Sequence, residues 1–407
     1  MNRVTATTTR RRTGFAFPWR GLLVLAVLIG LVRVFFCAVL RVQTGSMEPT
    51  LHGDPVRGDE ILVFTPYYKV WSPERFDLAM FERPSNDDTQ NLAAEKLNVK
   101  RIVGLPGESI RIDDGGLYVT QAGGSVEKRI AKTYSEFRPL LIRRFFERFG
   151  AEFESHFIYD PQEVRPEHDG VTLIGGENKP LGAEIELAPQ AVPLDDGWMD
   201  ASGVDHPGEN PEQDMLFDLE VNVKSPNACM NFSFSIGGND FSIDIVPRGP
   251  GHDITALRLT DTNPTEFREQ VRAISPDSKH RLEFFFIDGQ IGVAVDGRKA
   301  LCEAVAPSGG SVGSGRGMSH PKFSVWASEA RVTKFEAWRD IHYTEPSGTT
   351  YGGHASSFQV PSDSVYVLGD NSRDSIDSRF YGAVPLKSLQ GLPIFVVGPR
   401  PRMGFIH

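Results

Sequence analysis

Residues 21–40 read GLLVLAVLIGLVRVFFCAVL, an apolar run about as long as a helix needs to cross a bilayer. Five arginines precede the run, and the first acidic residue, Glu48, follows it. Basic residues ahead of a span place the N-terminus in the cytoplasm. We therefore expect residues 1–20 to be a basic cytoplasmic segment and residues 21–41 a single transmembrane helix. The rest of the chain then lies on the periplasmic or extracytoplasmic side of the cell (inner) membrane.

A cleavable signal peptide is the competing interpretation of this run. The apolar region is long for a signal peptide, and no small-x-small cleavage site follows it. Arg33 interrupts the run, and a charge at the centre of a span costs about 2.5–3.5 kcal/mol. Arg33 lies in the outer half, where its side chain can reach the interface. The sequence favours an uncleaved anchor.

The composition is that of a globular protein, with 407 residues of which 40% are hydrophobic and 24% charged. The net charge of −10 gives no reason to expect nucleic acid as a partner. The 40 Gly and 28 Pro favour strands and turns over helices. Cys229 and Cys302 are either free thiols or one disulfide, and the sequence leaves both open.

Short segments rich in β-forming residues fill residues 42–120, and the same style returns over residues 351–407. Residues 121–165 carry charges and aromatics at roughly helical spacing, which predicts a partly helical connector. Residues 166–350 alternate as strands do, with a hairpin whose Asp-Gly turn lies at 288 and 289. The predicted fold is mainly β: an N-terminal transmembrane helix and a β-rich core interrupted by a β-sandwich domain.

The stretch QTGSMEPTL, residues 43–51, places a serine directly after the membrane segment. A serine hydroxyl is a poor nucleophile until a base takes its proton. His52 is the only histidine near Ser46 in the sequence, and no spacing supports a histidine triad. Lysine is the alternative base, provided that burial lowers its pKa. Lys100 lies in the apolar segment LNVKRIVGL and fits that requirement.

Four motifs occur in order along this anchored chain: GSMEPTL (45–51), RFDLAMF (75–81), KRIVGLPGE (100–108) and GDNSRDSIDSR (369–379). Together they resemble the type I signal peptidases. The resemblance covers about residues 20–120 and 355–400. It implies a serine endopeptidase, with a Ser-Lys dyad, that removes N-terminal signal peptides from exported precursors after small residues of the Ala-x-Ala type. The implied partners are those precursors, docked as an added strand, and the lipid bilayer.

The resemblance also implies roles for individual residues. Ser46 matches the nucleophile and Lys100 the general base. The hydroxyl of Thr44 and the backbone N–H of Ser46 match the oxyanion-hole donors. Ser375 matches the hydroxyl that orients the lysine. The residues that match structural support of the site are Asp377, Arg379 and Asp370.

Two positions depart from the family pattern. Phe76 stands where the family usually carries Gly, and we expect the bulky residue to change the membrane-facing surface without touching the chemistry. Ser372 precedes Arg373, where many relatives place Arg directly after Asn. The spacing from Gly369 to Ser375 is that of the family.

The inserted residues resemble a laminin-G or concanavalin-like jelly roll, which implies either a glycan or peptide ligand or a spacer role. No His-Glu-x-x-His or Cys-x-x-Cys pattern occurs, so we expect no metal site and no cofactor. Two other functions were weighed. A self-cleaving Ser-Lys repressor would need a helix-turn-helix and no anchor. An anchored binding protein would carry an inactive peptidase core, against which Ser46 and Lys100 argue.

Overall fold

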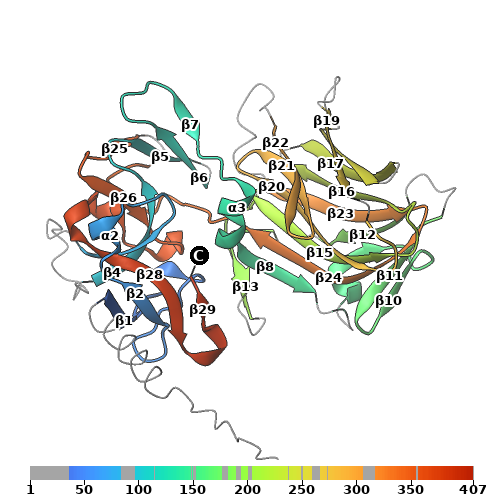
Figure 1. The fold of residues 1–407 in the computed structure, drawn as a ribbon, viewed down its shortest axis with the longest axis horizontal. Coiled ribbons are helices and arrows are strands. Elements are labelled where there is room, and N and C mark those ends of the chain that lie inside the picture. Colours follow the sequence, from blue (N-terminus) through green and yellow to red (C-terminus); the bar gives the residue numbers. More distant parts are fainter. Residues whose placement is uncertain are drawn as a thin grey trace, which may run out of the picture.

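The computed structural model describes residues 36–406 except 84–96, 114, 148, 150–152, 177–181, 189–193, 200–203, 237, 249–250, 259–265, 273, 306–316 and 354–355. The described chain is mainly β and forms two bodies, side by side in Figure 1. The first is made from both ends of the chain, drawn blue to cyan and red, and is called the split unit. The second, green to orange, is called the inserted unit and contains the strands between residues 142 and 339.

The larger sheet of the split unit is antiparallel, in the order β1-β2-β28-β3-β4-β26-β27, with β29 beside β28. Its strands are β1 (Cys37–Arg41), β2 (Glu60–Phe64), β3 (Leu78–Glu82), β4 (Leu97–Gly104), β26 (Ser364–Leu368), β27 (Val384–Pro385), β28 (Leu389–Gly398) and β29 (Gly404–Phe405). A second sheet has the order β25-β5-β6-β7. Its strands are β5 (Ser109–Asp113), β6 (Gly116–Thr120), β7 (Glu127–Arg129) and β25 (Phe358–Gln359). Strands from the two ends of the chain thus pair within both sheets.

The expected transmembrane helix of residues 21–41 lies outside the described residues except at its end. At that end the prediction is wrong, because Cys37–Arg41 form strand β1, which pairs antiparallel with β2. The pairing supplies the backbone hydrogen bonds that a helix would otherwise supply. Within the described part of the chain, no helix has the length and apolar character to cross a membrane.

Helices are few and short in the described residues. The α-helices are α2 (Tyr67–Val70), α3 (Tyr134–Phe137), α4 (Phe153–His156) and α5 (Ser378–Tyr381). The 3₁₀ turns are η1 (Gly45–Met47), η2 (Arg138–Leu140), η3 (Ser372–Asp374), η4 (Leu386–Ser388) and η5 (Arg400–Arg402). Two of these turns, η1 and η3, present the residues of the site described below.

Two antiparallel sheets make up most of the inserted unit. The first has the order β10-β11-β24-β15-β20-β21-β22, with β8 beside β24, and the second the order β19-β18-β17-β16-β23-β12-β9. The strands of the first are β8 (Ile142–Glu147), β10 (Val164–Glu167), β11 (Gly170–Ile174), β15 (Met215–Val223), β20 (Lys279–Ile287), β21 (Gln290–Val295), β22 (Arg298–Ala304) and β24 (Glu329–Arg339). Those of the second are β9 (Phe157–Tyr159), β12 (Ala183–Leu187), β16 (Cys229–Ile236), β17 (Asn239–Arg248), β18 (Gly251–Arg258), β19 (Glu266–Arg272) and β23 (Met318–Trp326). The pair β13 (Trp198–Met199) and β14 (Asp205–His206) stands apart.

Aromatic side chains join these two sheets across a shared core. Phe232 of the second sheet stacks on Phe284 of the first, with ring centroids 4.7 Å apart. The ring centroid of Phe217, in the first sheet, lies 5.0 Å from the ring centroid of Phe232. All three are fully buried, and burying one such ring contributes roughly 1.5–3 kcal/mol. The alternation along β16, in which every second residue is buried, is the pattern that predicted these strands.

The predicted Asp-Gly turn is confirmed. Asp288 and Gly289 join β20 to β21 and have φ angles of 53° and 73°. Two successive positive φ angles are what a two-residue hairpin turn of type I′ requires.

The partly helical connector predicted for residues 121–165 is wrong over most of its length. Among the described residues of this range only α3 and α4 are α-helical, whereas residues 142–147 form β8, which pairs with β24. Phe145 is buried in the core of the inserted unit, so tertiary packing overrides the local helical spacing. The sheets of the inserted unit therefore begin at residue 142, not at residue 166. Cys229 and Cys302 are free thiols.

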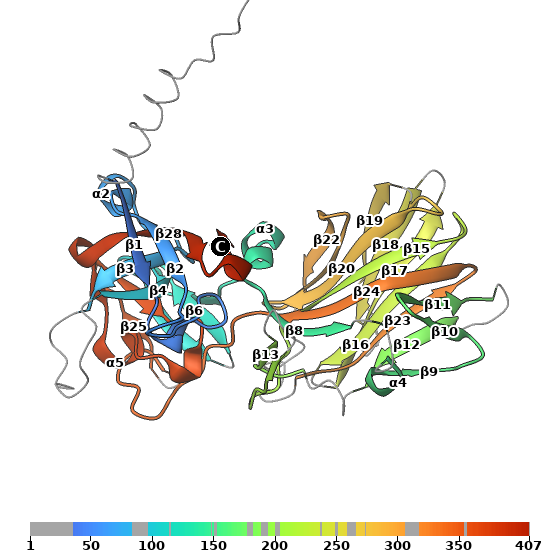
Figure 2. The same ribbon diagram turned by 90° about the horizontal axis from the view of Figure 1, so that it is seen from below.

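The segments that join the two units meet each other. The incoming segment, residues 129–141, leaves β7, and the outgoing segment, residues 340–345, leaves β24 and crosses to the split unit (Figure 2). Lys132 of the first lies 2.6 Å from a carboxylate oxygen of Asp340 of the second. Tyr343 donates its backbone N–H to the carbonyl of Gly115 over 3.1 Å.

Candidate active site

A single turn presents Ser46. Residues Gly45–Met47 form η1 directly after β1, and Ser46 and Met47 are buried there. Met47 and Leu51 pack into the apolar cluster beneath the larger sheet. The backbone N–H of Leu51 donates to the carbonyl of Met47 over 2.9 Å. These contacts anchor the turn that carries Ser46.

Lys100 reaches that hydroxyl from the neighbouring strand. It lies in β4, opposite Ala79 of β3, and is 2% exposed. Its Nζ donates a short hydrogen bond to Oγ of Ser46. The structure thus brings together the two residues that sequence reasoning put forward as a pair, although 53 residues separate them in the chain.

Burial changes the charge state of this lysine. Desolvation of the ammonium is the largest effect and lowers the pKa of Lys100 from 10.5 to about 8. The negative charge of Asp377 raises this pKa, and the positive charge of Arg379 lowers it further. Asp370 and Asp374, in the same loop, also raise it. A neutral amine hydrogen-bonded to a hydroxyl can accept its proton, which is the chemistry that a serine nucleophile needs.

Thr44 stands beside this pair. Its Oγ1 lies 3.4 Å from Oγ of Ser46, and either hydroxyl can be the donor. A cavity of about 270 Å³ opens at the same place. Its walls come mostly from the end of β1 and the turn that follows, within residues 40–47, and from residues 97–99 of β4, with Ile61 and Met80 between them in the lining. An extended chain can therefore reach Ser46 between two backbone segments.

The loop after β26 closes the other side of the site. Asp377 is fully buried and accepts hydrogen bonds from the hydroxyl of Ser375 (2.7 Å) and the backbone N–H of Gly369 (3.0 Å). Arg379 pairs with both oxygens of Asp377, at 2.8 and 2.7 Å. Among the described residues, Ser375 makes no hydrogen bond to Lys100 and instead binds Asp377. Ser375 nevertheless lies against Gly369: a Cβ added to Gly369 would come within 2.2 Å of the Ser375 hydroxyl oxygen.

The same loop touches the Ser46 turn directly. The carbonyl of Ser46 accepts the backbone N–H of Asn371 over 3.2 Å, and the Asn371 side chain donates to the carbonyl of Gly45 over 3.1 Å. A Cβ on Gly369 would lie 2.4 Å from the Ser46 carbonyl oxygen, so only glycine allows this approach. Asn371 therefore holds the turn in place, a contact that sequence reasoning did not specify.

Asp370 forms a buried ion pair that sequence reasoning missed. Arg101, which follows Lys100, donates from Nε and Nη2 to the two carboxylate oxygens of Asp370 at 2.8 and 2.6 Å. The hydroxyl of Thr50 donates to the same carboxylate over 2.6 Å. Neither Arg101 nor Asp370 is exposed. The pair joins β4, the segment after the Ser46 turn and the loop after β26, and Arg101 in the motif KRIVGLPGE was the available signal.

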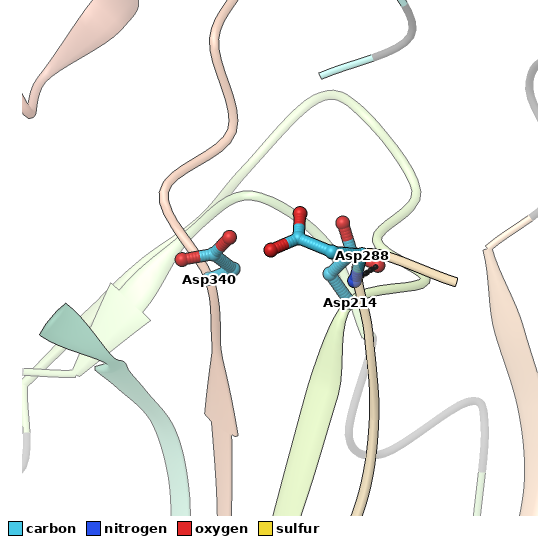
Figure 3. Close-up of side chains that lie close together, drawn as sticks. All are labelled: Asp214, Asp288 and Asp340. Atoms are coloured by element: carbon cyan, nitrogen blue, oxygen red, sulfur yellow. Dashed lines mark hydrogen bonds between the residues drawn. The ribbon is translucent and has the colours of Figure 1, made fainter. Parts of the chain in front are cut away.

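One carboxylate cluster in the described residues has the spacing of a metal site. Asp214, Asp288 and Asp340 point toward one another in Figure 3. The protein's own cations already occupy their oxygens. Lys132 lies 2.8 Å from Asp288 and 2.6 Å from Asp340, and Arg129 pairs with Asp214. The arrangement is an internal ion-pair network of the junction between the two units.

The family model described as "Signal peptidase, peptidase S26" matches residues 18–156 and 325–397, more than half of the chain. The chain belongs to this family. The stretch between the two matched parts, residues 157–324, contains most strands of the inserted unit. The family match thus spans the split unit and, of the inserted unit, β8, α4 and β24.

Curated relatives are signal peptidases. "Signal peptidase I" of Streptococcus pneumoniae is 32% identical over 106 residues, which cover 26% of this chain and 44% of that protein. "Signal peptidase I" of Bacillus licheniformis is 30% identical over 104 residues, 25% of this chain and 50% of that protein. "Signal peptidase I T" of Bacillus subtilis is 28% identical over 134 residues, 33% and 60%. The chain spans about half the length of the curated relatives it matches.

Among solved structures, the chain is similar to a laminarinase from Rhodothermus marinus, at 9% identity and a TM-score of 0.36, over 49% of this chain and 97% of that one. It is also similar to a carbohydrate-binding module from Bacillus subtilis, at 9% identity and a TM-score of 0.28, over 43% and 89%. At TM-scores this low, neither likeness supports a conclusion about fold or function.

Proposed function

We propose that this chain is a membrane-anchored serine endopeptidase that removes signal peptides from exported precursors. The observation that carries the proposal is the buried hydrogen bond from Lys100 to Ser46, within a chain of the signal peptidase family. Ser46 is the proposed nucleophile and Lys100 the proposed general base. The lowered pKa of Lys100, about 8, supports this assignment because only the neutral amine can accept a proton.

The proposed reaction has two halves. Oγ of Ser46 attacks the scissile carbonyl while its proton moves to Nζ of Lys100. The new oxyanion is stabilised by the hydroxyl of Thr44 and the backbone N–H of Ser46. Lys100 then gives the proton to the leaving amine, which departs and leaves an ester on Ser46. A water molecule, deprotonated by Lys100, hydrolyses that ester and regenerates the hydroxyl.

The loop after β26 is proposed to support this reaction without taking part in it. Asp377 pairs with Arg379 and accepts the backbone N–H of Gly369, whereas Asp370 pairs with the side chain of Arg101. Ser375 is the proposed orienting hydroxyl for Lys100. Its bond to Asp377 supports a preset position for that hydroxyl, close to the Ser46 carbonyl.

The proposed substrate is a precursor still held in the membrane by its leader and cleaved after an Ala-x-Ala sequence. The cavity between residues 40–47 and 97–99 supports binding of an extended segment as an added strand. The apolar residues that precede β1 support a single N-terminal anchor, with the N-terminus in the cytoplasm and the split unit at the outer face of the cell membrane. We also propose that the inserted unit is a jelly-roll-like β-sandwich, whose two sheets share one aromatic core.

The test is cleavage of a precursor with an Ala-x-Ala leader by the detergent-solubilised full-length protein. We expect Ser46→Ala and Lys100→Ala each to lower kcat/KM by at least about a thousandfold, because each removes one half of the dyad. Lys128→Ala, the same change at an exposed lysine of β7, is the matched control and should cleave normally. Activity within tenfold of wild type in either dyad variant refutes the mechanism. Absence of cleavage by the wild type refutes the function and favours the anchored binding protein.

A further inference from the structure

The two positions that depart from the family pattern both lie where the inserted unit joins the split unit. Phe76 contacts the incoming segment, and Ser372 contacts the outgoing segment. The Phe76 ring packs against an apolar cluster that contains Ile142 of β8 and Ile341 of the outgoing segment. Both positions thus contact the segments that join the two units.

Phe76 adopts a backbone conformation that glycine favours. Its φ of 73° lies in the left-handed region, which costs a residue with a side chain roughly 1–2 kcal/mol. Its ring lies under the ammonium group of Lys132, 5.5 Å from Nζ to the ring centroid. The Phe76 carbonyl accepts a hydrogen bond from Arg101 over 2.8 Å. The incoming segment thus contacts Phe76, whose carbonyl is hydrogen-bonded to Arg101, the residue next to Lys100.

Ser372 forms the contact with the outgoing segment. It is 4% exposed, and its Oγ accepts the backbone N–H of Thr344 over 2.9 Å and Nη1 of Arg379 over 2.8 Å. The same Nη1 donates to the carbonyl of Thr344 over 2.6 Å. The peptide groups of Thr344 are therefore held at both ends, by Ser372 on one side and by Arg379 on the other.

From Arg379 the contacts continue to the catalytic turn. Arg379 holds Asp377, and Asp377 accepts the N–H of Gly369, which lies against the Ser46 carbonyl. Every side chain along this path is buried, and a buried hydrogen-bond network with all its members satisfied fixes a single geometry. A displacement of Thr344 would therefore reach the loop that faces Ser46 and Lys100.

We propose that the outgoing segment of the inserted unit is a positioning element of the active site, acting through Ser372 and Arg379 on the loop that faces Ser46. This proposal rests on the proposed peptidase function and goes beyond it, because it gives the inserted unit a part in catalysis. A spacer joined to the split unit by passive connections would leave the loop unchanged when the Thr344–Ser372 contact is lost.

Ser372→Ala is the decisive variant, because it removes the acceptor and leaves two donors without their shared partner. We expect kcat for the Ala-x-Ala precursor to fall by about tenfold to a hundredfold, since small misplacements in an active site have effects of this size. KM should stay within about twofold, because the cavity of residues 40–47 and 97–99 is untouched. A loosened loop should also admit water to Lys100 and move the midpoint of the pH–kcat profile toward alkaline pH.

The control is Ser347→Ala, the same change at an exposed residue two positions beyond the outgoing segment, which should cleave as the wild type does. If Ser372→Ala does not fold, Ser372→Cys takes its place, because sulfur nearly keeps the volume but is a weak acceptor. A folded Ser372 variant with wild-type kcat and an unmoved pH midpoint overturns the proposal while wild-type cleavage keeps the peptidase function standing. Failure of the wild type to cleave overturns the function itself.

Discussion

The pH dependence of cleavage tests the assignment of Lys100 most directly. Burial lowers the pKa of Lys100 from 10.5 to about 8. With this pKa, about 9% of the molecules carry the neutral amine at pH 7, about half at pH 8 and about 91% at pH 9. With the ordinary pKa, only about 0.3% would be neutral at pH 8. Since the neutral form is the base, kcat/KM should rise about tenfold per pH unit below pH 8 and level off above it.

The measurement is the initial rate of precursor cleavage by the full-length protein from about pH 6 to about pH 10, with the unfolding temperature recorded at each pH. His52 is the histidine nearest to Ser46 in the chain, and its Nδ1 lies 3.0 Å from a carboxylate oxygen of Glu48. His52→Gln therefore serves as the control, and its profile should keep the midpoint near pH 8. A rate that does not change with pH, or a midpoint that His52→Gln abolishes, would refute the lysine base.

Further predictions concern stability, measured by urea unfolding. Lys100→Met should stabilise the protein by about 3 kcal/mol below pH 8. The gain should vanish as pH rises to about 10.5, because between these two pH values only the unfolded wild-type chain keeps the proton on Lys100. Asp370→Ala should cost about 3–5 kcal/mol, since the guanidinium group of Arg101 stays buried without its carboxylate; a loss below 1 kcal/mol would contradict that. Phe76→Gly should be about 1 kcal/mol more stable than Phe76→Ala, because only alanine keeps the cost of the positive φ. Phe284→Ala should cost about 3–5 kcal/mol through a cavity in the inserted unit, and an unchanged transition would refute its place in the core.

Much of the strand pattern could be predicted from the sequence, because alternation and turn residues are local signals. The β-rich stretch of residues 42–120 contains β5 and β6 as expected, and the turn at Asp288 and Gly289 is where the sequence puts it. The helical interpretation of the connector, residues 121–165, failed at residues 142–147 for a reason that no local signal carries. Charges and aromatics at helical spacing are compatible with a strand once a partner such as β24 supplies hydrogen bonds.

The site divides in the same way. Ser46 and Lys100 could be paired from the motifs, since their chemistry requires each other. The Arg101–Asp370 pair and the bond from Asn371 to the Ser46 carbonyl depend on how distant segments fold together, which spacing does not encode. The contact of Ser372 with Thr344 is the extreme case. One residue belongs to a family motif and the other lies beyond the last strand of the inserted unit, so only the folded chain relates them.

The meeting of the incoming and outgoing segments has an evolutionary consequence. A stretch of chain whose two ends touch, as Lys132 touches Asp340, can be gained or lost in one genetic event without pulling the host's strands apart. Removal of the residues between the two segments would leave the strand pairs of the split unit intact, because its sheets, as far as the structure describes them, contain no strand from residues 142–339.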